Sequence, residues 1–266
     1  MRNQLKVSIW NVNSIRVRTS QLNEHISTEQ PDIVLLQEIK CEEHNFPLHE
    51  INELDKYNFS INGQKSYNGV AILSKFPLED IKFNFPCNPC PDQARFIEAK
   101  CLTGGVGYIR IISIYVPNGG EVDSEKYQTK LTFIDKLTEY LRNRNVGESI
   151  ILGGDFNVAQ YDNDVYSAAN LKNTTGFTLP ERQSIRRLIN SNFIDIYRLI
   201  YPHKQEFTWW SYQSRAFKNN LGMRIDYILC TPTITQKATD CYINRHNTYQ
   251  NSDHAPVTAV FSEKNI

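Results

Sequence analysis

Five short polar motifs each lie at the end of an apolar run of the sequence. They are Trp10–Asn13, Gln37-Glu38, Gly154–Asn157, Arg224–Tyr227 and Ser252–His254. Short apolar runs are typical of buried strands, and a polar side chain at the rim of a core is costly unless it has a partner or a function. Asn, Asp, Glu and His are also the residues that bind hard cations and transfer protons. We therefore expect the five motifs to form one site.

Glu38 offers a carboxylate directly after the run Ile33–Gln37, where packing alone gives no reason for one. A solvated strand end would also explain it. Together with the amide of Asn11, at the end of another run, it would provide hard oxygen ligands. Such a site suits Mg²⁺, which keeps several waters and uses few protein ligands.

Paired glycines precede the most specific motif, in which Asp155 and Asn157 follow the run Ser149–Leu152. Glycines allow a tight turn or a close approach of the backbone. On an extended segment, Asp155 and Asn157 would alternate onto the same side. One could then accept a proton from water while the other donates a hydrogen bond to a phosphate oxygen. An Asp-Asn turn would explain the glycines but not the matching motifs elsewhere.

His254 follows Asp253, but neighbours on an extended chain point apart, so Asp253 need not hold the imidazole. Asp226 is the better candidate to orient the ring. A histidine polarised by a carboxylate is suited to act as an acid, a base or a ligand of a phosphate oxygen. The other histidines lie in polar stretches and are expected to be solvated: His25, His44, His49, His203 and His246.

Two further segments contain aromatic residues near possible site residues. Tyr115 ends a β-rich run before the turn Pro117–Gly120, and it could be a core residue or a phenol donor to an anionic oxygen. The block Phe207–Tyr212 is followed by basic residues, a pattern typical of surfaces that contact nucleic acid. A buried tryptophan cluster is the competing interpretation and is expected to explain one of the two tryptophans.

The composition limits the function classes. The chain of 266 residues has 29 basic and 29 acidic residues, so any contact with a polyanion must come from a local patch. No secretory signal and no run of about 18 apolar residues is present, so we expect a cytoplasmic protein without a membrane partner. The spacing of Cys87 and Cys90 matches a metal clip, but no second pair or nearby histidines complete it, and surface-loop thiols are the preferred interpretation.

Short apolar runs separated by only a few helical patterns predict the fold class. The runs that predict strands are Lys6–Trp10, Ile33–Gln37, Val70–Ser74, Phe96–Lys100, Tyr108–Tyr115, Ile150–Leu152, Ile225–Cys230 and Val257–Phe261. Helices are predicted over Thr19–Glu29, Ser124–Arg144 and Pro180–Ile189, with Ser124 as an N-cap. Because no repeat or linker interrupts the chain, we expect a single domain over residues 1–266. The expected architecture is α/β, a four-layer sandwich of two mixed β-sheets flanked by helices.

In this order, the motifs resemble the exonuclease III family of abasic-site endonucleases, within the endonuclease/exonuclease/phosphatase superfamily. The resemblance covers Lys6 to Phe261, and the Pro-Asn-Gly-Gly turn and the absence of an N-terminal extension are similar to bacterial members. The motifs that carry it are Trp10–Arg16, Leu36–Glu38, Asn68–Lys75, Tyr115–Gly119, Gly154–Ala159, Gly176–Arg182, Met223–Tyr227 and Ser252–Val257.

The resemblance implies a Mg²⁺-dependent phosphodiesterase, with Mn²⁺ as a substitute, that cleaves duplex DNA on the 5′ side of abasic sites. It also implies 3′→5′ exonuclease and 3′-end-cleaning activities, blocked 3′ ends as substrates, and a monomer. The implied metal residues are Asn11, Glu38, Asp155, Asn157 and Asp253. The implied catalytic residues are Tyr115, Asp155, Asn157, Asp226 and His254. The residues expected to contact DNA, from the resemblance and from the basic and aromatic pattern, are Asn118, Arg182, Trp209, Arg215, Lys218, Met223, Arg224 and Ile225.

The chain departs from the family pattern at three places. Met223 stands where some relatives have Trp, Asn13 replaces an Asp of the eukaryotic branch, and the stretch Tyr249–Asn251 has no basic residue. Two alternatives differ in what they require. A sphingomyelinase-like or inositol-phosphate phosphatase-like hydrolase would share the metal site without the tryptophan and basic block. A retired DNA-binding scaffold would have lost a catalytic residue.

Overall fold

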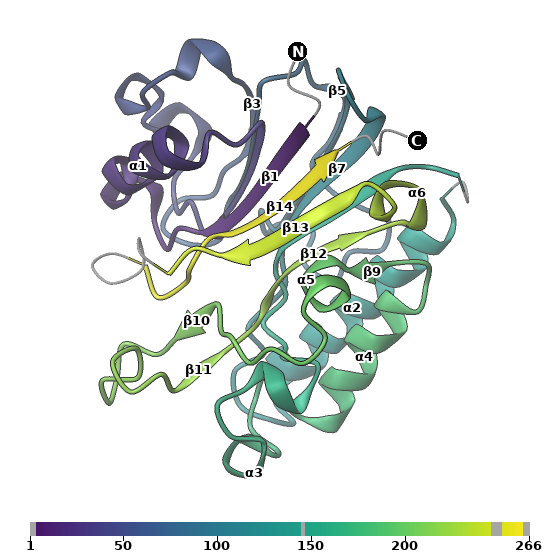
Figure 1. Ribbon diagram of the computed structural model, residues 1–266. Helices are drawn as coiled ribbons and strands as arrows, with labels where there is room; N and C mark the ends of the chain where they lie inside the picture. The colour runs from purple at the N-terminus through teal and green to yellow at the C-terminus, as the bar shows by residue number, and fades with distance from the viewer. Residues whose placement is uncertain (1–3, 145–146, 246–251, 263–266) are drawn as a thin grey trace.

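Two mixed β-sheets face each other in the computed structural model, which describes residues 4–144, 147–245 and 252–262 (Figure 1). The first sheet has six strands in the order β13, β14, β1, β2, β4, β3. Their bounds are β1 Gln4–Asn11, β2 Ile33–Gln37, β3 Asn58–Asn62, β4 Val70–Ser74, β13 Ala238–Ile243 and β14 Val257–Ser262. The second sheet also has six strands, in the order β5, β6, β7, β8, β12, β9. Their bounds are β5 Glu79–Lys82, β6 Phe96–Thr103, β7 Gly107–Tyr115, β8 Ile150–Asp155, β9 Ile194–Asp195 and β12 Asp226–Cys230.

Helices cover the outer faces of both sheets, so that the layers run helix, sheet, sheet, helix (Figure 1). Helix α1 (Thr19–Glu29) lies on the first sheet, and α2 (Glu125–Arg142) and α4 (Leu179–Ile189) lie on the second. The shorter helices are α3 Ala168–Leu171, α5 Ile196–Ile200 and α6 Pro232–Thr235, and β10 Trp209–Trp210 pairs with β11 Gly222–Met223. The 3₁₀ turns are Ile15–Val17, Glu43–Asn45, Leu48–Glu50, Leu54–Lys56 and Asp162–Asp164. The expected four-layer α/β sandwich is confirmed.

Each sheet is mixed because one pair of strands is joined through a helix. The pairs β1–β2 and β7–β8 are parallel, and the chain crosses over through α1 and α2 respectively. The other pairs are antiparallel. Within the described residues, no helix combines the length and the apolar character that crossing a membrane requires.

Two glycines at the end of β8 allow close approaches: Gly153 to the opposite sheet, and Gly154 to the neighbouring strand β7 of its own sheet. A Cβ atom on Gly153 would lie 2.6 Å from a methyl carbon of Ile9 in the opposite sheet. Gly154, with a φ of +146°, would place a Cβ 2.0 Å from the carbonyl oxygen of Ile114. Only glycine fits at these positions. The close approach places Asp155 next to the strand ends of the first sheet.

Candidate active site

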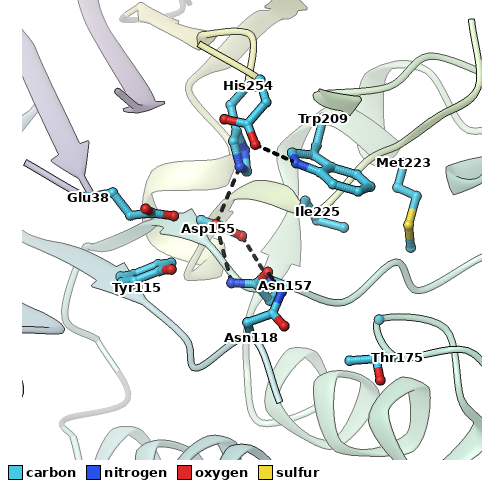
Figure 2. Close-up of a pocket in the computed structure, with 12 residues that line it drawn as sticks. Glu38, Tyr115, Asn118, Asp155, Asn157, Thr175, Trp209, Met223, Ile225 and His254 are labelled. Atoms are coloured by element: carbon cyan, nitrogen blue, oxygen red, sulfur yellow. Dashed lines mark hydrogen bonds and ion pairs between the residues drawn. The ribbon is translucent and has the colours of Figure 1, made fainter. Parts of the chain in front are cut away.

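The polar strand ends meet around one cavity of about 200 Å³ (Figure 2). Asn11 is the last residue of β1 and Asp155 is the last of β8, where it pairs in register with Asp226, the first residue of β12. An isolated bridge between Trp209 and His254 adds the C-terminal motif. The cavity is lined by Glu38, Tyr115, Asn118, Asp155, Asn157, Thr175, Gly176, Trp209, Met223, Ile225, Asp253 and His254.

His254 is held between two carboxylates. Its Nδ1 lies 2.9 Å from Oδ2 of Asp226, and its Nε2 lies 3.7 Å from Oδ2 of Asp155. Burial alone would lower the pKa of His254, but Asp226 and then Asp155 outweigh burial and raise it to about 10. The imidazole is therefore a cation at neutral pH, able to donate a proton or a hydrogen bond. The predicted pairing of His254 with Asp226 is confirmed.

Asp155 lies at the centre of the hydrogen-bond network. It accepts from the side-chain amide of Asn11 at 2.9 Å and from the backbone N–H of Asn157 at 2.8 Å. Burial raises the pKa of Asp155 to about 7; the His254 cation opposes the rise, and the nearby carboxylates add to it. A carboxylate with a pKa near neutrality is suited to take a proton from water.

The side chain of Asn157 meets that of Asp155, but not along an extended segment as predicted. Asn157 has a φ of +53°, so the chain turns there in the left-handed region. The turn places its side-chain amide 3.3 Å from Oδ2 of Asp155 and 2.9 Å from the carbonyl of Val116. Asn118 donates to Oδ1 of Asn157 at 3.2 Å.

Glu38 faces the same cavity from the first sheet. The Nδ2 atom of Asn11 donates to Glu38 at 2.8 Å as well as to Asp155, and the Oδ1 atom of Asn11 accepts from the backbone of Asn13 at 3.0 Å. Asn11 thus holds the two carboxylates in place. Lys40, which the sequence interpretation did not include, lies 2.8 Å from Glu38. Burial would raise the pKa of Glu38, but the hydrogen bonds from Asn11 and Lys40 outweigh it and lower the pKa.

Asp253 also lines the cavity and is fixed from both sides. Asn13 donates to one oxygen and the indole of Trp209 to the other, each at 3.0 Å. With Glu38, it gives the cavity hard carboxylate donors, and no cysteine is among the described lining residues. This donor set suits Mg²⁺. In the described chain, one cluster of three side chains of types that bind metals is present: Asp155, Asp226 and His254. Both ring nitrogens of His254 face the carboxylates of this cluster.

The phenol of Tyr115 closes another side of the cavity. Burial, and then the charges of Glu38 and Asp155, hold the pKa of Tyr115 well above its usual range. The group stays protonated, as a donor to an anionic oxygen must. Arg95, also absent from the sequence interpretation, lies over the Tyr115 ring at 4.6 Å and borders the adjoining groove.

An apolar wall faces these polar groups. Trp209, Met223 and Ile225 line the cavity and pack with Phe177 and Ala159. Trp209 is partly exposed and Trp210 is buried, so the prediction that one tryptophan belongs to the core is confirmed.

The structure contradicts one of the expected DNA contacts. Arg224 is 1% exposed, and its guanidinium donates to Asp164 at 2.7 Å and to Asp195 at 2.7 Å. A guanidinium held by two buried carboxylates cannot bind a phosphate on the surface. Arg224 was expected to contact DNA because it lies in the same short motif as Asp226, and the sequence does not show that its partners are Asp164 and Asp195.

The other expected basic contacts are accessible to different degrees. Arg215 and Lys218 are exposed on the loop between β10 and β11. Arg182 is partly exposed, bonded to Asp162 at 2.9 Å and stacked 4.4 Å from the Phe177 ring.

Three expectations outside the site have different outcomes. His25 is buried, not solvated, whereas His44, His49 and His203 are exposed; His246 and Tyr249–Asn251 lie outside the described residues. Of the expected surface thiols, Cys87 is exposed and Cys90 is buried.

Comparison with known proteins identifies relatives over nearly the whole chain. A model of the endonuclease/exonuclease/phosphatase family matches residues 9–254. The exodeoxyribonuclease III of Haemophilus influenzae is 33% identical over 97% of this chain and 100% of its own length. An AP endonuclease from Archaeoglobus fulgidus has a TM-score of 0.89 at 36% identity, covering 97% of this chain and 99% of that one. A 3′ phosphatase from Neisseria, solved with a product DNA hairpin, has a TM-score of 0.90 at 34% identity, with the same two coverages. These matches confirm the resemblance indicated by the motifs.

Proposed function

We propose that this chain, which belongs to the endonuclease/exonuclease/phosphatase family, is a metal-dependent phosphodiesterase of DNA repair. It cleaves duplex DNA on the 5′ side of an abasic site and leaves a 3′-hydroxyl. The same site supports 3′→5′ exonuclease activity and removal of blocking groups from 3′ ends. The protein acts as a monomer. The relatives named exodeoxyribonuclease III, AP endonuclease and 3′ phosphatase support this range of activities.

The observation that carries the proposal is the pairing of a proton-transfer unit with an apolar wall in one cavity. Asp155 and His254 lie on one side, and Trp209, Met223 and Ile225 on the other. An abasic sugar lacks a stacked base, so extruding it from the duplex costs less than flipping a normal nucleotide. The small cavity accepts the bare sugar and excludes a base by size.

Each polar group has a place in the hydrolysis. Asp155 takes a proton from the attacking water, whose oxygen bonds to phosphorus as the bond to the 3′ oxygen breaks. The phenol of Tyr115 donates to a phosphate oxygen, and the side-chain amide of Asn157 would do so with the N–H that contacts Asp155 at 3.3 Å in the free protein. His254, oriented by Asp226, stabilises the phosphate as negative charge develops and supplies the proton that the leaving 3′ oxygen takes up.

Glu38 and Asp253 would hold Mg²⁺, for which Mn²⁺ can substitute, with Asp155 and Asn157 close by. When bound, the ion would neutralise phosphate charge and stabilise the leaving oxygen. Asn11 fixes the spacing between Glu38 and Asp155. Lys40, now bonded to Glu38, would balance the carboxylate charge.

A substrate panel tests the proposed function. We expect a labelled duplex with one abasic site to be cut on its 5′ side in Mg²⁺, and a 3′-phosphate end to be cleaned more slowly. The release of nucleotides from an intact nicked duplex measures the exonuclease activity. Hydrolysis of sphingomyelin or inositol phosphates, with abasic DNA left uncut, would refute the proposal.

A further inference from the structure

A fully buried ion pair lies behind the cavity without lining it. Lys130 on α2 and Glu181 on α4 both have 0% exposed side chains, and their charged atoms are in hydrogen-bond contact. Burial lowers the pKa of Lys130, and the charge of Glu181 opposes that shift. Replacing a buried ion pair by apolar residues of similar volume is often neutral or stabilising. Stability alone therefore does not explain this pair.

The ammonium group of Lys130 joins two segments that carry site residues. Besides Glu181, it donates to the carbonyl of Asn118 at 3.0 Å and to the carbonyl of Asn157 at 2.7 Å. A lysine has three N–H donors, so these contacts use all of them. The first carbonyl belongs to the loop after β7, and the second to the turn after β8.

Each segment turns at the point of contact. Asn157 has a φ of +53°, in the left-handed region that asparagine enters more readily than most residues other than glycine. On the other loop, Gly119 has a φ of +95° and lies against the lysine stem; a Cβ there would be 2.9 Å from its Cδ. The lysine thus fixes how the two loops lie relative to each other.

Glu181 extends the connection to a third segment. Its carboxylate accepts from the backbone N–H of Gly176 at 2.9 Å and from that of Thr178 at 3.0 Å. Gly176 and its neighbour Thr175 line the cavity, and Figure 2 shows Thr175 on the side away from Glu38 and Tyr115. One ion pair therefore connects three walls of the cavity.

We propose that Lys130 and Glu181 are positioning residues that set the geometry of Asn118, Asn157 and the Thr175-Gly176 wall around the scissile phosphate. The inference rests on the proposed function for its substrate. The pair touches no reacting atom; it acts through the carbonyls and N–H groups that it holds. Loss of the lysine should reduce turnover through misplaced site residues and leave binding of the duplex nearly unchanged.

The test separates positioning from a purely structural role. Lys130→Met keeps the stem but leaves Glu181 as an unpaired buried charge, which will destabilise the fold. The double variant Lys130→Met/Glu181→Gln removes that charge, and the glutamine oxygen can still accept from Gly176 and Thr178. We expect the double variant to regain thermal stability while its single-turnover cleavage rate on an abasic duplex stays about 10- to 100-fold below that of the wild type. The Kd for DNA should stay within about threefold.

Arg110→Met is the matched control. Arg110 is paired with Glu98, whose side chain is 0% exposed, and neither residue lines the cavity. This variant should lose thermal stability but keep the wild-type single-turnover rate. A double variant with a rate within threefold of the wild type, or a control that loses as much rate as the double, would overturn the positioning role.

A second measurement does not depend on the substrate. Hydrogen exchange should become faster in residues 116–120, 155–159 and 174–178 of the double variant, and stay unchanged there in Arg110→Met. If the wild type fails to cut abasic DNA, the proposed function is wrong. The hydrogen-exchange rates of the three segments then still test whether the ion pair connects the three walls. Unchanged exchange in the double variant would refute that connection.

Discussion

Lowering the pH should destabilise the protein through His25, which is buried on α1 beside Trp10, with ring centroids 6.2 Å apart. Among the described residues, neither ring nitrogen has a hydrogen-bond partner. Burial lowers the pKa of His25 from 6.5 to about 4, and the charge of Glu29 only partly opposes that shift. The neutral ring is therefore favoured in the folded state, and the unfolded chain binds the proton more readily.

The sign and size of the effect follow from these two pKa values. The folded-state value is depressed, so the contribution to stability is fully present above pH 6.5 and is lost as the pH falls toward 4. Linkage gives a loss of about 2 kcal/mol at pH 5 and about 3 kcal/mol at pH 4, relative to neutral pH. For a chain of this size, 1 kcal/mol corresponds to roughly 2–4 °C in Tm.

His25→Leu is the test, because leucine keeps an apolar side chain of similar size and cannot take up a proton. We expect the Tm difference between His25→Leu and the wild type to widen between pH 7 and pH 4 by roughly 6–12 °C. Differential scanning calorimetry across that range measures it. Parallel Tm curves for the two proteins would refute the reasoning. The result also bears on activity, because Trp10 lies between His25 and the site: its indole donates to the carbonyl of His254 at 3.0 Å. Acid unfolding through His25 would therefore contribute to the loss of activity at low pH in a pH–rate profile.

Three further predictions concern the site and its surroundings. Glu38→Ala should lose most activity at low Mg²⁺ and recover part of it at high Mg²⁺; full wild-type activity in excess EDTA would contradict the metal role. Trp209→Ala should lower the preference for abasic over intact DNA roughly fivefold, the equivalent of about 1 kcal/mol of aromatic contact, as compared in cleavage rates on the two duplexes. Arg224→Met should destabilise the fold by about 3–5 kcal/mol and leave the salt dependence of DNA binding unchanged. Lys218→Ala should reduce the slope of log K against log salt concentration by about 1 at unchanged Tm. The opposite pattern would show that Arg224 contacts DNA.

The strands that the sequence predicted best are those with a continuous apolar run. The predictions for β2, β4 and α1 match the observed bounds, and the other predicted elements differ only at their ends. The edge strands of both sheets were missed: β3 and β13 in the first, and β5 and β9 in the second. In β13, one residue of Ala238–Ile243 is fully buried, so the segment lacks the apolar run that marks a central strand.

The site could be predicted where a polar residue lies at either end of an apolar run, as Asp155 does after one and Asp226 before another. Buried cations could not be assigned, because their partners lie far away in the sequence. Lys130 pairs with Glu181, which is 51 residues away in the sequence, and Arg224 pairs with Asp164, which is 60 residues away. One signal was present: Lys130 lies three residues after Tyr127 and four before Ile134, on the apolar face of its helix.

The most direct test of the proposed chemistry is single-turnover cleavage of an abasic duplex by Asp155→Asn and His254→Ala. Both variants remove a proton-transfer group and leave the apolar wall in place. We expect cleavage rates to fall by on the order of 10²–10⁴, while the Kd for the duplex changes only a few-fold. Folded variants that bind the duplex and cleave it at near wild-type rates would contradict the account.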